Sequence, residues 1–137
     1  MQPFDRTKTL EQLEGDVWPH NAYPSRVVQE SQRLRRVPVD RLTLEDLRFL
    51  LGQQIGSAFL VSIALEHLSD DPLASGDLFR GDLLSNLLAL PAEFWAKHPE
   101  LNNEVVELGI QVHGIYDTLA EVLPAFQRFK VVDSKPL

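Results

Sequence analysis

The chain has 137 residues, with 20 Asp and Glu against 13 Lys and Arg, and a formal net charge of −7. The absence of cysteine excludes disulfides and thiolate metal sites, while the polar start and short apolar runs predict neither a secretory signal nor a membrane span. We therefore expect one cytoplasmic domain over residues 1–137, with 131–137 as a frayed tail.

The first third of the chain predicts two short helices joined by a loop. Residues 7–15 form the first helix, which a threonine caps and Gly15 ends. Residues 25–36 form the second, which ends before Pro38. In the loop between them, we expect Trp18 and Tyr23 to pack onto the body. The run of Arg33, Arg35 and Arg36 is interpreted as a solvated helix end rather than a phosphate site.

The middle of the chain predicts the core. Thr43 begins a helix that Gly52 ends or bends, and apolar residues at helical spacing over 55–68 predict a central helix. Small residues at 56–58 allow a neighbouring helix to approach closely. A turn-rich stretch follows over 70–81, after which we expect Asp82 to cap a helix over 83–90.

Prolines mark the remaining helices. Pro91 precedes a short helix over 92–97, and Pro99 opens a last helix that runs to about residue 123. Pro124 bends that helix, with residues 125–130 continuing it. No stretch alternates with period two, so the predicted fold is all-α, a single compact bundle-like domain of about six to eight helices.

The charge is concentrated in the second half. Residues 69–121 contain ten acids and two bases, Arg80 and Lys97. A field of this sign repels nucleic acid and attracts basic proteins, although solubility alone also accounts for an acidic surface.

Nothing in the sequence forms a recognisable catalytic or metal motif. The four histidines, at 20, 67, 98 and 113, lack metal-ligand spacing, and no serine lies in a nucleophile elbow. Gly81 is followed by an aspartate, which would repel phosphate. We expect no catalytic residue, cofactor or metal, and hence no enzyme. One alternative is a small hydrolase built from His67 with Asp70, Asp71 and Asp77.

Several segments together resemble a known family. They are Leu42-Thr-Leu-Glu-Asp-Leu-Arg48, Gly52-Gln-Gln-Ile-Gly56, Ile63-Ala-Leu-Glu66, Asp71-Pro-Leu-Ala-Ser-Gly-Asp77 and Gly81-Asp-Leu-Leu84, with looser matches at 14–18 and 33–38. In this order they are similar to one immunity family of bacterial contact-dependent growth inhibition (CDI). The similarity covers about residues 10–95.

The resemblance implies a cytoplasmic protein that binds one cognate toxin domain, in a 1:1 complex, and neutralises it. Such toxins are often basic nucleases, and the inhibitor needs no cofactor, membrane or direct nucleic-acid contact. We expect binding through Asp70, Asp71, Asp77, Arg80, Asp82, Glu93, Trp95, Glu100, Glu104 and Glu107. The alternative is a helical adaptor or regulator that binds another basic cellular protein.

Overall fold

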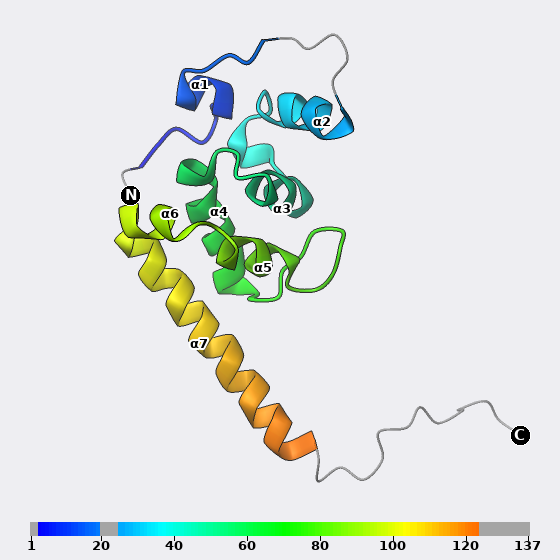
Figure 1. Ribbon diagram of the computed structural model, residues 1–137, viewed down its shortest axis with the longest axis vertical. Helices are drawn as coiled ribbons and strands as arrows, with labels where there is room; N and C mark the ends of the chain where they lie inside the picture. Colours follow the sequence, from blue (N-terminus) through cyan, green and yellow to red (C-terminus); the bar gives the residue numbers. More distant parts are fainter. Residues whose placement is uncertain (1–2, 20–24, 124–137) are drawn as a thin grey trace, which may run out of the picture.

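Seven α-helices, one 3₁₀ helix (Val39–Arg41) and no strand make up the part of the chain that the computed structural model describes, residues 3–19 and 25–123 (Figure 1). The helices are α1 (Leu10–Glu14), α2 (Arg26–Leu34), α3 (Leu44–Gly52), α4 (Ser57–Asp70), α5 (Asp82–Leu88), α6 (Ala92–Lys97) and α7 (Pro99–Val122). The predicted all-α fold is confirmed. The predicted segment over 125–130 and the predicted tail lie outside the described residues.

Helix α4 is the centre of the array, and α3, α5 and α7 all pack against it. Leu60, Val61, Ala64 and Leu68 of α4 are each 0% exposed. Burial of one large aliphatic side chain contributes about 1.5–3 kcal/mol, so this helix supplies much of the stability. Helices α1 and α2 lie at one end of the array, while α7 runs along α4 and extends well beyond it (Figure 1).

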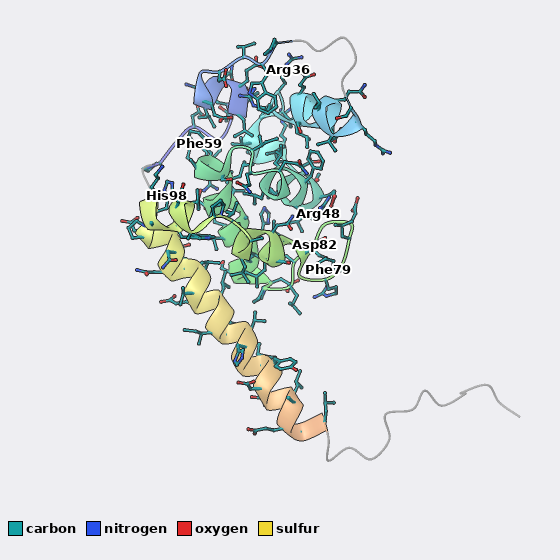
Figure 2. The ribbon with its side chains drawn as sticks, viewed as in Figure 1. Arg36, Arg48, Phe59, Phe79, Asp82 and His98 are labelled. Carbon is teal, nitrogen blue, oxygen red and sulfur yellow. The ribbon has the colours of Figure 1, made fainter. Side chains whose placement is uncertain are left out.

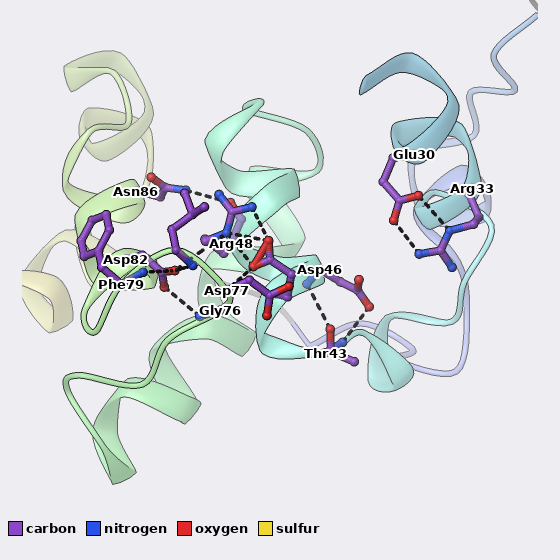
Figure 3. Close-up of polar contacts among 12 residues, drawn as sticks. Glu30, Arg33, Thr43, Asp46, Arg48, Gly76, Asp77, Phe79, Asp82 and Asn86 are labelled. Carbon is purple, nitrogen blue, oxygen red and sulfur yellow. Dashed lines mark hydrogen bonds and ion pairs between the residues drawn. The ribbon is translucent and has the colours of Figure 1, made fainter. Parts of the chain in front are cut away.

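Local capping explains where several helices begin. The Thr43 hydroxyl accepts the N–H of Asp46 at 3.1 Å, and the Asp46 carboxylate accepts the N–H of Thr43 at 3.0 Å (Figure 3). This capping box satisfies two amides that the first turn of α3 would otherwise leave unpaired. Thr9 and Ser25 cap α1 and α2 in a related way. None of the described helices is both long and apolar enough to cross a membrane.

Arg35 joins the loop after α1 to the end of α2. Its side chain is 1% exposed, and its guanidinium lies 4.2 Å from the centre of the Trp18 ring. The same guanidinium donates to the carbonyl of Asp16 at 2.7 Å and to the carboxylate of Glu14 at 3.3 Å. The expected packing of Trp18 is therefore confirmed, while Tyr23 lies outside the described residues.

The interpretation of the basic run as a solvated helix end is wrong at Arg35. Arg33 and Arg36 are exposed and pair with Glu30 and Glu11. Arg35 instead turns inward, where the Trp18 ring and two oxygens replace part of the water that its guanidinium loses. Its buried Nε has no hydrogen-bond partner among the described residues.

Gly56 allows a close approach between α4 and α1. It precedes α4 with φ of +66°, and a Cβ atom here would lie 2.7 Å from both terminal methyl carbons of Leu10. Leu10 is 0% exposed, so it has no room to move away. The small residue therefore accommodates a side chain of α1.

We predict that Gly56→Ala lowers the free energy of unfolding by about 1–3 kcal/mol, through left-handed backbone strain and overpacking. Gly109→Ala is the matched control. Gly109 lies within α7 with nothing within 4 Å of an added Cβ, so alanine should leave stability unchanged or raise it by up to about 1 kcal/mol. Denaturant unfolding of both variants measures the difference, and equal effects would contradict this account of Gly56.

Candidate docking surface

Eight of the ten residues predicted to bind a partner are exposed, and they extend from the end of α4 to α7. They are Asp70, Asp71, Asp77, Arg80, Glu93, Glu100, Glu104 and Glu107. Trp95 is half-buried and packs edge-on against Phe94, with ring centroids 5.1 Å apart. Asp82 differs from all of them, because its side chain is buried.

Asp82 holds the loop that precedes it. Its side chain is 1% exposed, and its two oxygens accept the backbone N–H groups of Gly76 at 2.8 Å, Leu78 at 3.0 Å and Phe79 at 3.3 Å (Figure 3). The predicted cap is corrected: α5 begins at Asp82 itself, after Gly81, and the carboxylate does not cap it. Because its oxygens accept amides inside the molecule, Asp82 is not exposed to a partner.

Two residues of α3 brace the same loop. Arg48 forms an ion pair with Glu45, and its Nε lies 3.9 Å from the Asp82 carboxylate (Figures 2 and 3). Glu45 accepts the N–H of Asp77 at 2.7 Å, and the Asn86 amide donates to the carbonyl of Arg48 at 2.8 Å. We call Glu45, Arg48, Asp82 and Asn86 the polar cluster. It joins α3, α5 and the loop between α4 and α5.

The pKa shifts follow from these contacts. Burial raises the pKa of the Asp82 carboxyl, but the three N–H donors and Arg48 outweigh it, so the pKa lies below its ordinary value. The hydrogen bond with Arg48 is the main cause of the lowered pKa of Glu45. A carboxylate whose pKa is lowered by folding stabilises the fold above its unfolded pKa, and this contribution is lost as pH falls through the folded pKa.

The fixed loop displays two large apolar side chains to solvent. Phe79 is 58% exposed (Figure 2), and Leu78 beside it is 66% exposed. The next residue, Arg80, lies 3.7 Å from the Asp71 carboxylate. The backbone amides of this loop are bonded inward, so the side chains face outward on a restrained backbone. Arg80 and Asp71 are among the predicted binding residues, whereas Leu78 and Phe79 are not. Their adjacency within a turn-rich acidic stretch was the available signal.

An acidic groove lies beside the loop, between it and helices α2 and α3. It is lined by Arg26, Val27, Glu30, Glu45, Asp46, Phe49 and Asp77. Of the acids lining it, Asp77 alone is a predicted binding residue, and the others lie more than thirty positions earlier in the chain. Part of this charge is already paired, since Glu30 binds Arg33 and Glu45 binds Arg48.

Two further grooves lie along α7. One is mainly apolar and is formed by Leu73 and Arg80 of the loop, Leu84 and Leu88 of α5, and Val112 of α7. The other brings together two predicted acids, Glu104 and Glu107, beside Leu65 of α4. The structure therefore groups some of the predicted residues around α7 and separates them from Asp77.

The residues of the hydrolase alternative do not assemble into a metal site. His67 and Asp70 are exposed at the end of α4, and Asp71 accepts the N–H of Leu73 at 3.0 Å. In the described ranges, no group of three or more His, Asp or Glu side chains is placed to hold a metal ion.

A family model of CDI immunity proteins matches residues 12–105, more than half of the chain. The chain belongs to the CDI immunity proteins. This confirms the family inferred from the segments between Leu42 and Leu84, which include three members of the polar cluster. No curated protein and no solved structure matches the chain. An immunity role follows from the family, and the matched range ends within the first third of α7.

We predict that Asp82→Asn lowers the free energy of unfolding at neutral pH by about 1–3 kcal/mol, because an amide NH₂ replaces an oxygen that accepts loop amides. Amide exchange at Leu78 and Phe79 should become faster. The difference in the free energy of unfolding between wild type and the variant should narrow below pH 3.8, the ordinary pKa of aspartate, as wild-type Asp82 becomes protonated. Asp70→Asn, at an exposed site, is the control. Equal stability of the two variants at neutral pH would contradict the role of Asp82.

Proposed function

We infer that this CDI immunity protein binds the toxin domain of its own effector and neutralises it by covering a surface that the toxin needs. The observation that carries this proposal is the family match over residues 12–105. The family also favours this function over an adaptor that binds some other cellular protein. The proposal further holds that the toxin is a basic nuclease, that the complex is 1:1 and that it forms in the cytoplasm without a cofactor.

The loop over residues 71–81 is the proposed centre of docking. Leu78 and Phe79 are exposed there, and the polar cluster holds the backbone beneath them before any partner arrives. A preorganised loop loses little conformational freedom on binding, so more of the contact energy appears as affinity. Large aromatic side chains near the centre of an interface commonly dominate its energy.

The surrounding acids are proposed to attract the toxin and fix its orientation. Asp70, Asp77, Glu104 and Glu107 are exposed, and the whole chain has an excess of seven negative charges. Exposed charges of this kind raise the association rate of a basic partner more than they raise affinity. Glu93, Glu100 and the half-buried Trp95 are proposed to lie toward the edge of the contact.

The test is co-expression of the wild-type chain with the toxin domain encoded immediately upstream, followed by measurement of binding in purified material. We predict restored growth and a stable complex whose affinity falls as salt rises, because salt screens exposed charges. Toxicity that persists with no detectable complex would overturn the proposal.

We also predict that Phe79→Ala weakens the complex at least about tenfold, because truncation of a central hot-spot residue costs about 2 kcal/mol or more and about 1.4 kcal/mol is a tenfold change in affinity. Val17→Ala is the matched control, because Val17 is 69% exposed and lies near α1, away from the loop. Fluorescence anisotropy or calorimetry measures both affinities. An unchanged affinity for Phe79→Ala would exclude the loop as the centre of docking, with the immunity function itself left standing.

A further inference from the structure

The second half of α7 projects beyond the rest of the described residues, and none of these residues covers its apolar face (Figure 1). Leu101, Val105 and Leu108 are buried against the body. Further along the same helix, Ile115 is 53% exposed and Leu119 is 51% exposed. Because each residue adds 1.5 Å to an α-helix, the part after Leu108 is about 20 Å long.

The exposed side chains continue the face that is buried in the first half. The apolar positions alternate in steps of four and three: Leu101, Val105, Leu108, Val112, Ile115, Leu119 and Val122. Steps of four and three keep side chains on one face of a helix, as in the seam of a coiled coil. We call Ile115, Leu119 and Val122 the open stripe. An exposed apolar stripe of this kind often marks a contact with another molecule.

The open stripe is continuous with the apolar groove beside the loop. Val112 precedes the stripe on the same face of α7, and it lines that groove with Leu73 and Leu88. Leu88 is itself 57% exposed and Leu73 is 42% exposed. The groove therefore connects the loop to the projecting helix, and one partner can contact both.

The charge of α7 favours a basic partner over a second copy of this chain. Residues 99–122 contain five acids, at positions 100, 104, 107, 117 and 121, and no Lys or Arg. Two such helices laid side by side would bring acids together, and neither helix supplies a Lys or Arg to pair with them. The projecting half also lies beyond residue 105, where the family match ends.

We propose that the projecting half of α7 inserts its open stripe into an apolar groove of the toxin domain that is bordered by Lys or Arg side chains. This inference rests on the proposed function and adds a second binding element to it. The helix-in-groove mode uses anchors three and four residues apart on one face, which is the spacing of the stripe. Cognate specificity would then depend on this helix, while the loop provides the centre of the contact.

The test uses the full chain and the purified upstream toxin domain. The variant is Ile115→Gln with Leu119→Gln, which removes the stripe while keeping good helix formers. The control is Val106→Gln with Ile110→Gln on the opposite face of the same helix, where the two side chains are 48% and 67% exposed. Ile110 is nine residues before Leu119, which is two and a half turns. Toxin affinity, denaturation midpoint and molecular mass in solution are measured for wild type and both variants.

We expect the stripe variant to bind the toxin at least about tenfold more weakly than the control variant does. Both variants should have the mass of a monomer and the same denaturation midpoint. Equal toxin affinity of the two variants would overturn the inference while wild-type binding keeps the proposed function. If wild type and the control variant are dimers and the stripe variant is a monomer, the inference is overturned, because the stripe then binds a second copy of this chain. A lower midpoint for the stripe variant alone would overturn it in favour of residues 124–137 as the occupant. Failure of the wild-type chain to bind would instead remove the proposed function and, with it, this inference.

Discussion

The buried carboxylate of Asp82 is the contact on which the displayed surface depends. Its oxygens accept three backbone amides of one short loop, and Arg48 stands 3.9 Å away to balance its charge. A buried charge is costly unless it is bonded in this way. The same bonds fix the backbone of Leu78 and Phe79, whose side chains are 66% and 58% exposed.

Local signals in the sequence predicted most of the helices but not the polar cluster. The start of α3 follows from Thr43 and Asp46, three residues apart, and the start of α7 follows from Pro99, because capping and proline geometry involve neighbours in the chain. Asp82 was misread as a cap, since its partners depend on how the preceding loop turns back. Arg35 was misread as solvated for a similar reason: Trp18, 17 positions earlier, covers it.

The residues that hold the loop lie within the family match, whereas the open stripe of α7 lies outside it. Glu45, Arg48 and Asp82 come from segments that carry the family resemblance, and they connect α3, the loop and α5. The open stripe of α7 lies outside the matched range. Under the proposed function, the residues within the match would support the loop, and the stripe would add a contact outside the match. The binding residues were predicted mainly from charge, so nearly all of them are acids. The apolar loop residues and the stripe carry no charge and were therefore not predicted.

The structure of the complex between this chain and its toxin domain tests the central claim most directly. The account predicts that one continuous toxin surface buries both Phe79 on the loop and Leu119 on α7, with the Asp82 hydrogen bonds unchanged from the free protein. A complex in which both side chains stay exposed to solvent, and the toxin contacts only the opposite end around α1 and α2, would contradict it.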